Sequence, residues 1–244
     1  MPNIILVTSG KGGVGKSTVA AALGLTYAAM RRKTVIVELD IGLRGLDLML
    51  GVEDRTVYDL GNIVRGECKL SDGVVPVTAD GHLSLVAAPS GISSRIDYDD
   101  VAAFCKALSR FFDTVIVDAP AGIGVSLLLA PKIADLVLVV ATPDMVSARD
   151  AGRLTGMLGQ YGVSDIRLVI NKVYHKKIHQ NEIEDLDAVI DLVGAQLIGV
   201  VPMDEELSSI EFGPDSFRKK TLCSKVFYNI ASRILGDYIE LLIQ

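Results

Sequence analysis

A glycine-rich segment at residues 10–17 constrains this chain more than any other part of its sequence. It reads Gly-Lys-Gly-Gly-Val-Gly-Lys-Ser, follows an apolar run at 4–7 and precedes a sequence that favours a helix at 18–23. The pattern is G-x-x-x-x-G-K-[ST] in a strand–loop–helix setting, where glycines let backbone N–H groups converge on phosphate oxygens. The helix that follows directs the positive end of its dipole at the same anion. The segment therefore predicts a P-loop, which is a site for a nucleoside triphosphate.

The loop also supplies charged and hydroxyl groups for a nucleotide and a metal ion. Lys16 is expected to hold the β- and γ-phosphates and to act in catalysis, because its charge opposes that of the transferring group. The Ser17 hydroxyl is expected to be a Mg²⁺ ligand. The predicted nucleotide-binding residues of the loop are Gly10, Lys11, Gly12, Gly13, Val14, Gly15, Lys16, Ser17 and Thr18.

A dinucleotide site is the main competing interpretation of the same segment. The glycines also match G-x-G-x-x-G, and Glu38 and Asp40 stand near the end of the next apolar run, where a ribose-binding acid is expected. However, the Lys-Ser pair that ends the loop has no role in a dinucleotide site and is required in a P-loop. A further apolar run at 114–117 ends in Asp118, as the strand that carries a Walker B aspartate should. The P-loop interpretation is therefore favoured.

Composition limits the class of protein. A chain of 244 residues, half of them hydrophobic, can bury a large core, and we expect one α/β domain over residues 1–244. No apolar run in the sequence reaches the ~20 residues of a membrane-spanning helix, and the chain starts directly on a strand rather than on a signal peptide. Cys68, Cys105 and Cys223 lie far apart, which argues against a disulfide framework and indicates a reducing cytosol.

Apolar runs rich in β-branched residues alternate with helical patterns along the chain. The runs are continuous, as in parallel strands covered on both faces, so the pattern predicts a single doubly wound, mostly parallel sheet with helices on both faces. The predicted strands are 3–8, 34–39, 83–87, 114–118, 136–141, 166–170 and 197–201. The predicted helices are 16–31, 98–112, 125–134, 145–161, 181–193 and 221–242.

Several polar residues stand at or just after the carboxyl ends of the predicted strands. In doubly wound folds, ligands bind beyond that edge of the sheet. Residues that are far apart in the sequence are therefore expected to share one site, which contains Lys11, Lys16, Asp40, Asp118 and Asn171.

The second lysine of the loop, Lys11, is not needed by the generic motif, and here the chain resembles a known family. The loop GKGGVGKS is similar to the deviant Walker A motif of the MinD/ParA family of P-loop ATPases. The segment 38–47 resembles the first switch of that family, 118–123 its Walker B motif and second switch, and 198–202 the segment near the nucleotide base. The resemblance covers nearly the whole chain and is strongest to the MinD branch, whose members select the cell-division site.

The resemblance implies an ATPase that works as a switch. It implies slow, Mg²⁺-dependent hydrolysis of ATP to ADP, an ATP-bound homodimer, and a protein activator or effector. Lys11 would reach across the dimer to the partner's phosphates as a catalytic cation, and Asp40 would orient the attacking water. The family often carries Asp where this chain has Glu38, which weakens any role for position 38.

The resemblance also assigns the contacts to the metal and the base. Asp118 and Asp40 would hold Mg²⁺ through water, with Ser17 as a direct ligand, because Mg²⁺ keeps several waters and binds few carboxylates. Asn171, which follows a predicted strand, would pair a donor and an acceptor with the adenine edge, and Pro202 would lie near the base.

Three other functions remain open within this fold. A metal- or cluster-insertion ATPase would use paired cysteines, which the isolated Cys68, Cys105 and Cys223 do not provide. A ParA-type partitioning ATPase would bind DNA through a basic surface, and a net charge of −6 makes DNA an unexpected partner. A module that binds nucleotide without turnover is disfavoured by the intact Lys16, Asp40 and Asp118.

Contact with a membrane also remains open. The stretch 172–179 is locally basic and could face a partner or a membrane, and its His175 and His179 lack a third metal ligand. The last predicted helix has a broad apolar face, but its final turns carry Asp237 and Glu240 rather than the cationic face of an interfacial anchor. We expect a cytoplasmic protein without a clear C-terminal anchor, for which peripheral attachment to the inner face of the cell membrane is not settled.

Overall fold

The computed structural model describes residues 2–41, 44–89, 97–174, 186–203 and 221–241. The strands are β1 (Ile4–Thr8), β2 (Thr34–Glu38), β3 (Val75–Pro76), β4 (Leu83–Val86), β5 (Thr114–Asp118), β6 (Leu136–Ala141), β7 (Ile166–Val173) and β8 (Gln196–Pro202). They form one sheet in the order β3-β4-β2-β5-β1-β6-β7-β8, in which every neighbouring pair is parallel except β3 and β4. The doubly wound, mostly parallel sheet predicted from the sequence is confirmed.

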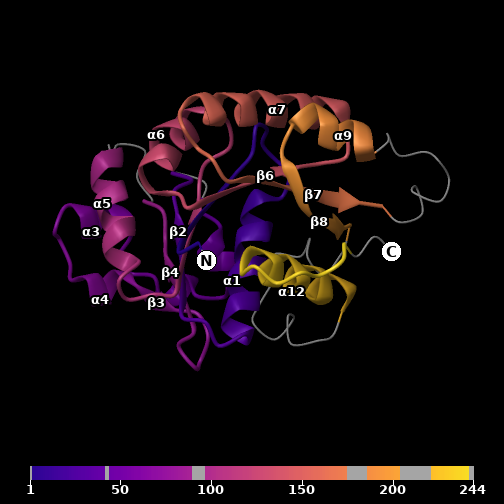
Figure 1. Cartoon of the computed structure of the whole chain (residues 1–244). Coiled ribbons are helices and arrows are strands. Elements are labelled where there is room, and N and C mark those ends of the chain that lie inside the picture. The colour runs from indigo at the N-terminus through magenta and orange to yellow at the C-terminus, as the bar shows by residue number, and fades with distance from the viewer. Residues whose placement is uncertain (1, 42–43, 90–96, 175–185, 204–220, 242–244) are drawn as a thin grey trace.

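The helices lie in layers on the two faces of the sheet (Figure 1). They are α1 (Lys16–Ala29), α2 (Leu46–Met49), α3 (Leu60–Val64), α4 (Leu70–Gly73), α5 (Tyr98–Leu108), α6 (Gly124–Ile133), α7 (Met145–Gln160), α9 (Leu186–Val193) and α12 (Leu222–Ile234), with a 3-10 turn η1 (Glu53–Arg55). Helices α5, α6, α7 and α9 pack on one face, and α1 and α12 pack side by side on the other (Figure 1). Helix α9 is the described part of the helix predicted over 181–193.

The alternation of side chains along each strand produces two hydrophobic cores, one on each face. In β1, Ile5 and Val7 face the layer of α1 and α12, whereas Ile4 and Leu6 face the layer of α5, α6 and α7. Strands covered on both faces need apolar residues at every position, which is why the apolar runs are continuous. Helix α1 is buried along most of its length because it lies between the sheet and α12. The glycine-rich loop at its amino end is therefore attached to the centre of the core.

Two helices are shorter than the sequence pattern predicts. The helix predicted over 98–112 ends at Leu108, and the helix predicted over 221–242 ends at Ile234. Gly236 follows the second of these with φ of 97°. A residue with positive φ cannot continue a right-handed helix, so the chain turns there although the apolar pattern runs on.

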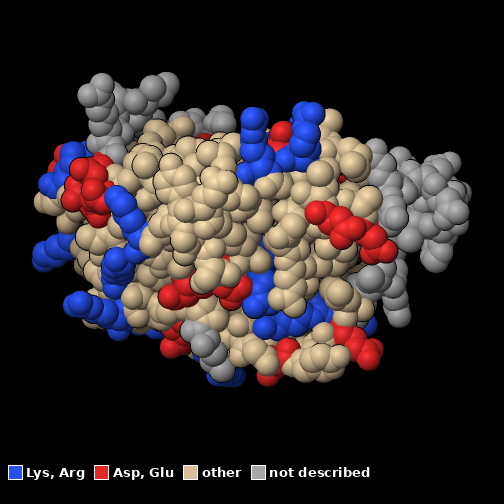
Figure 2. All heavy atoms as spheres, turned by 45° about the horizontal axis from the view of Figure 1, so that its top comes forward, with Lys and Arg blue, Asp and Glu red and all other residues tan. Residues whose placement is uncertain are grey.

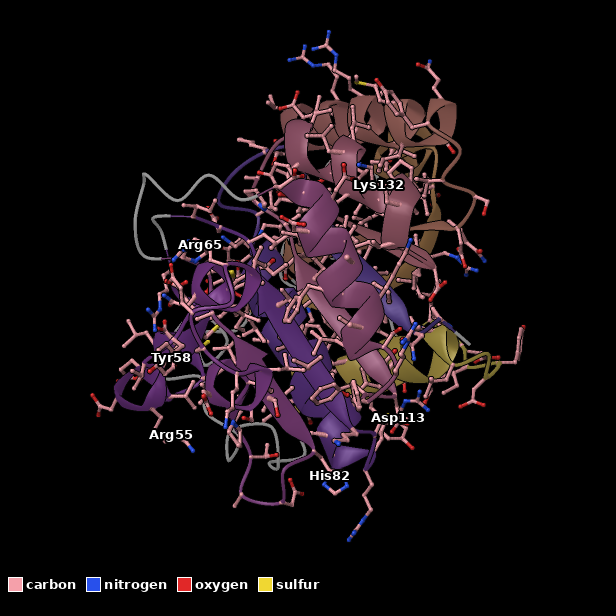
Figure 3. All side chains as sticks on the ribbon, turned by 90° about the vertical axis from the view of Figure 1, so that its left-hand side faces the viewer. Arg55, Tyr58, Arg65, His82, Asp113 and Lys132 are labelled. Carbon is pink, nitrogen blue, oxygen red and sulfur yellow. The ribbon has the colours of Figure 1, made fainter. Side chains whose placement is uncertain are left out.

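The segment between β2 and β4 contains elements that the sequence pattern does not reveal. Helices α2, α3 and α4 each have five residues or fewer, which is too short for a helical period to be recognised. Figure 3 shows this side of the molecule, with Arg55, Tyr58 and Arg65 labelled on it. The same view places His82 and Asp113, which come just before β4 and β5, in its lower half. The amino ends of these strands lie there, and the predicted site belongs to the opposite, carboxyl end.

The packing of α7 on α9 depends on a glycine. A Cβ at Gly152 would lie 2.3 Å from the carbonyl oxygen of Leu192, whereas a Cβ at Gly156, one turn later, would meet no atom within 4 Å. We expect Gly152→Ala to lower the free energy of unfolding by about 1–3 kcal/mol, and Gly156→Ala to raise it by about 0.5–1 kcal/mol. Urea denaturation followed by circular dichroism compares the two variants. Equal effects would contradict the close contact between the helices.

Candidate functional site

The glycine-rich loop connects β1 to α1 and requires glycine at defined positions. Gly13 and Gly15 have φ of 79° and 89°, in the left-handed region that residues with side chains rarely adopt. A Cβ at Gly10 would lie 2.5 Å from the carbonyl group of Asp150, so the loop backbone directly touches α7. Helix α1 begins at Lys16, and its first N–H groups are the donors expected to face a phosphate. This geometry is that of the predicted P-loop.

Lys16 and Asp118 form a buried ion pair at the centre of the site. Lys16 Nζ lies 2.6 Å from Asp118 Oδ1, and the two side chains are 6 % and 0 % exposed. The same Nζ donates to Ser17 Oγ at 3.2 Å. Asp118 ends β5 and pairs in register with Val7 of β1, so the ion pair ties the start of α1 to the middle of the sheet. Removing one partner would leave an uncompensated buried charge, which is strongly destabilising.

The groups around Asp118 act on its pKa in opposite directions. Burial raises the pKa of the Asp118 carboxyl, while the Lys16 ammonium and the Ser17 hydroxyl work to lower it. The negative charge of Asp40 raises the pKa further, so Asp40 lies within electrostatic range of the same carboxyl. Asp40 is partly exposed and follows Leu39, whose N–H donates to the Asp118 carbonyl oxygen at 2.9 Å. Two strand ends therefore bring these charged groups into one site.

One oxygen of Asp118 suits a hydrated metal ion. Asp118 Oδ2 is buried and has no hydrogen-bond partner within the described part of the chain. Buried polar atoms without a partner are rare, and a water molecule in the shell of Mg²⁺ would provide one. The Ser17 hydroxyl lies close enough to the same carboxylate to lower its pKa, and it accepts a hydrogen bond from Lys16. The pair therefore fits Mg²⁺ bound directly by Ser17 and through water by Asp118.

Asn171 and Lys172, in β7, donate hydrogen bonds to carbonyl groups of the glycine-rich loop. Asn171 Nδ2 donates to the Val14 carbonyl oxygen at 2.9 Å, and Lys172 Nζ donates to the Gly13 carbonyl oxygen at 2.7 Å. A Cβ at Gly15 would lie 2.3 Å from Asn171 Nδ2, so only glycine permits this approach. Lys172 has φ of 61°, which is uncommon for a residue with a side chain. The adenine contact of Asn171 stays a prediction, and the loop contacts are an addition that the sequence did not indicate.

The segment that follows Asp118, which the family resemblance predicts to be the second switch, is joined to the end of β1. The N–H of Gly122 donates to the Ser9 carbonyl oxygen at 2.9 Å. The buried hydroxyl groups of Thr8 and Ser126 lie 2.5 Å apart, which joins the start of α6 to the same strand end. A shift of this segment would therefore act on the residues that lead into the glycine-rich loop.

Lys11 is exposed, in contrast to Lys16. It lies near Asp144, the residue that caps the amino end of α7. Burial works to raise the pKa of Asp144, but hydrogen bonds from Thr142 and Ser147, together with the positive charge of Lys11, outweigh it and lower the pKa. An exposed cation at the mouth of the site is available to a second molecule, as the predicted role of Lys11 requires.

The remaining predicted residues lie around the same edge or outside the described chain. Thr18 is partly buried in the first turn of α1. Pro202 is buried at the end of β8, where it pairs with Val173. Residues 42–43 of the first switch lie outside the described residues, and so do residues 175–179 of the basic stretch.

Glu38 belongs to the site more closely than the sequence interpretation suggests. It ends β2 beside Asp118 in the sheet and is only 2 % exposed. Burial raises the pKa of its carboxyl, and hydrogen bonds from the N–H groups of Gly45, Leu46 and Ala88 work to lower it. The sequence offers one signal for this placement, a charged residue at the end of an apolar, fully buried run, because a buried carboxylate needs hydrogen-bond partners.

The alternative functions would need a metal-binding cluster or a basic surface, and the described residues offer little of either. Among them no group of three or more His, Cys, Asp and Glu is placed to hold a metal ion. Cys105 and Cys223 are buried in helices on opposite faces of the sheet. On the face in Figure 2, small groups of Lys and Arg are interspersed with Asp and Glu around a broad uncharged area, unlike a continuous DNA-binding surface. No helix in the described segments is both long and apolar enough to span a membrane.

Removal of the Lys16 charge should make the free energy of unfolding more dependent on pH, because Asp118 then stays buried without its charged partner. In Lys16→Ala the pKa of Asp118 in the folded protein rises further above its unfolded value. At the acid end the carboxyl is protonated in both states, and the substitution has its smallest effect. In wild type the folded state also keeps this proton up to its own raised pKa. Above that pH only the folded variant keeps it, so the stability of the variant falls relative to wild type by up to ~1.4 kcal/mol per pH unit. Urea denaturation at a series of pH values measures the slope.

The double variant Lys16→Ala/Asp118→Asn is the control, because an amide does not titrate, and the extra pH dependence should disappear in it. Lys16→Ala should also lose tight ATP binding at every pH, since the phosphates lose a charged donor. Wild-type ATP affinity in this variant, or the absence of an extra slope, would contradict the assigned roles of the pair.

Comparison with known proteins agrees with this geometry. Residues 5–214 match the family model described as CobQ/CobB/MinD/ParA nucleotide binding domain. The chain is 35% identical to the septum site-determining protein MinD of Bacillus subtilis (strain 168), over 99% of this chain and 92% of that protein.

Solved structures of proteins named MinD are also similar to this chain. The MinC:MinD cell division protein complex of Aquifex aeolicus contains a chain with a TM-score of 0.89 at 29% identity, covering 99% of this chain and 98% of that one. The septum site-determining protein MinD complexed with Mg-ADP from Pyrococcus horikoshii OT3 shares the fold, with a TM-score of 0.81 at 23% identity over 96% of both chains. The chain therefore belongs to the MinD/ParA family of P-loop nucleotide-binding proteins, and within it to the group of MinD proteins.

Proposed function

We propose that this chain hydrolyses ATP to ADP and phosphate with Mg²⁺, and that the cycle works as a dimerisation switch in division-site selection. The family assignment supports ATP hydrolysis, and relatives named septum site-determining proteins support the cellular role. The observation that carries the proposal is the contact between the P-loop lysine, Lys16, and Asp118 at the end of a central strand. The comparisons do not favour metal insertion or DNA partitioning, the alternatives within the same fold.

Binding begins at the glycine-rich loop. Its N–H groups and those of the first turn of α1 surround the phosphates. Lys16 donates to the β- and γ-phosphate oxygens, which compete with the Asp118 carboxylate for its ammonium group. Ser17 would hold Mg²⁺ directly and Asp118 through water, and the ion would supply positive charge to the same phosphate oxygens. Asn171 retains its amide oxygen for the adenine amino group while its Nδ2 supports the loop, and Pro202 borders the base.

Asp40 is the group that we assign to the attacking water. It stands beyond the end of β2, partly exposed, within electrostatic range of Asp118. A carboxylate at this position can accept a hydrogen bond from water and hold it in line with the γ-phosphate. It would also contact the metal ion through water.

Lys11 is the group that we assign to a second copy of the chain. It is exposed at the mouth of the site and can reach the phosphates of a facing subunit. ATP offers more negative charge to this cation than ADP does, so ATP favours the dimer and hydrolysis releases it.

A solved relative is part of a MinC:MinD complex, and we propose that this chain likewise works with a protein partner. In this proposal the partner accelerates a slow intrinsic hydrolysis, and the protein acts in the cytoplasm. Attachment to a membrane would then depend on the basic stretch or on a partner.

Asp40→Ala tests the assignment of the attacking water. ATP binding should stay within about threefold of wild type while turnover falls by at least ~10²-fold, because the orienting group acts only in the chemical step. The ATP-bound dimer should then persist, which light scattering over time can follow alongside phosphate release. Unchanged turnover would assign the water to another residue.

Lys11→Ala tests the contact between subunits. The variant should bind nucleotide measurably but stay monomeric with ATP and Mg²⁺, because removing a charged donor from a desolvated phosphate contact costs about 2–5 kcal/mol. Lys33→Ala is the matched control, since Lys33 is also exposed but precedes β2 at the opposite end of the sheet. Sedimentation with ATP, with ADP and without nucleotide compares the three proteins. ATP-dependent dimers of Lys11→Ala that match wild type would show that Lys11 makes no contact across the interface.

A further inference from the structure

The carboxylate of Glu38 joins three points of the backbone beside the site. Its Oε1 accepts hydrogen bonds from the N–H groups of Gly45 at 2.9 Å and Leu46 at 3.1 Å. Its Oε2 accepts from the N–H of Ala88 at 3.3 Å. These groups come from the start of α2 and from the residues after β4, two segments separated by more than 40 positions in the chain. One buried side chain thus links β2, α2 and β4.

These bonds satisfy groups that would otherwise lack partners. The first N–H groups of a helix have no acceptor within the helix. In α2 the capping residue is Gly45, which has no side chain that could accept a hydrogen bond from them. Glu38 supplies the acceptor from a neighbouring strand and places negative charge at the positive end of the short helix. The desolvated carboxylate and the desolvated N–H groups therefore need one another.

The same turn is held by a second set of contacts. Arg44 Nε lies 2.5 Å from Asp47 Oδ2, and Arg44 Nη2 donates to the Thr56 carbonyl oxygen at 3.2 Å. Asp47 is largely buried, and its other carboxylate oxygen accepts from the N–H of Leu48. The backbone where α2 begins, at Gly45 and Leu46, is therefore flanked by contacts of two acids, Glu38 before it and Asp47 after it.

Asp40 lies two residues from Glu38, at the end of the same strand. The N–H of Leu39, between them, donates to the Asp118 carbonyl oxygen. Residues 38 and 39 thus attach this strand end to β5 on one side and to α2 and β4 on the other. Asp40 is carried by backbone that is fixed immediately before it and again at Gly45, so its position depends on both attachments.

We infer that Glu38 is a positioning residue for ATP hydrolysis, which sets the place of Asp40 by anchoring the backbone of Gly45, Leu46 and Ala88 to the end of β2. The inference rests on the proposed ATPase function. Glu38 has its carboxylate oxygens engaged with backbone N–H groups and acts through the residues that it holds. The full reach of a glutamate is needed, because an aspartate at position 38 is one methylene shorter and cannot bridge α2 and β4 equally well.

Glu38→Gln tests the anchor directly. The amide side chain keeps the size of glutamate but replaces one acceptor oxygen with a donor, which faces an N–H group. In the nucleotide-free protein, amide hydrogen exchange measured by NMR should accelerate by about tenfold or more at Gly45, Leu46 or Ala88, and stay unchanged in β1. Glu67→Gln is the matched control, because Glu67 is exposed and pairs with Arg65 away from the site; it should alter none of these amides.

The second measurement compares chemistry with binding. In Glu38→Gln the turnover number should fall by about tenfold while nucleotide affinity stays within about threefold, since positioning of Asp40 matters only in the chemical step. A general loss of structure would lower both. Unchanged exchange at all three amides, or affinity that falls in step with turnover, would overturn the inference.

Glu38→Asp keeps the inference testable if the glutamine variant does not fold. It retains the charge, and the longest bond, to Ala88, should be lost first, so exchange should rise at Ala88 and turnover should fall less than in Glu38→Gln. Full protection of Ala88 would overturn the inference. If wild type hydrolyses ATP and both variants match its rate, the inference fails and the proposed function stands; if wild type does not hydrolyse ATP, the proposed function itself fails.

Discussion

The ion pair between Lys16 and Asp118 connects the core of the protein to its chemistry. Both side chains are removed from water, so each needs the other while no phosphate is present. Lys16 opens the buried helix α1, and Asp118 closes a central strand. Because the phosphates of ATP would compete for the same ammonium group, nucleotide binding and the arrangement of the two strand ends are coupled through this one contact.

The glycine-rich loop takes its shape from neighbours as well as from its own glycines. Gly10 touches the backbone of α7, and Asn171 and Lys172 hold the carbonyl groups that precede Gly15. These contacts point the carbonyl groups away from the cradle, so that N–H groups remain for a phosphate. The protein's own groups therefore support the shape of the loop, and such preorganisation lowers the entropic cost of binding.

Much of this arrangement can be predicted from the sequence, because it depends on local patterns of residues. Parallel strands covered on both faces give continuous apolar runs, and the motif around Lys16 fixes the loop between a strand and a helix. The same reasoning places Asp118 at a strand end and identifies Asp40 beyond another. Family resemblance adds Lys11, which the generic motif does not require.

The rest depends on contacts between distant residues or on elements too short to show a period. Asn171 and Val14 are 157 positions apart, and no pattern in either segment indicates their hydrogen bond. Helices α2 and α4 have four residues each, and packing rather than propensity decides their existence. The hydrogen bonds of Glu38 to Gly45 and Ala88 likewise join distant segments, and the sequence offers only the signal of a charged residue at the end of a buried apolar run.

The central claim is that Lys16 exchanges its buried partner for phosphate at a site completed by Asp118. A crystal structure of the protein with Mg²⁺ and a non-hydrolysable ATP analogue tests this most directly. The account predicts that the triphosphate lies in the glycine-rich loop, with Lys16 Nζ on the β- and γ-phosphate oxygens and Asp118 Oδ2 on a water of the metal shell. A nucleotide bound elsewhere, with the 2.6 Å contact between Lys16 and Asp118 unchanged and no metal between Ser17 and Asp118, would contradict it.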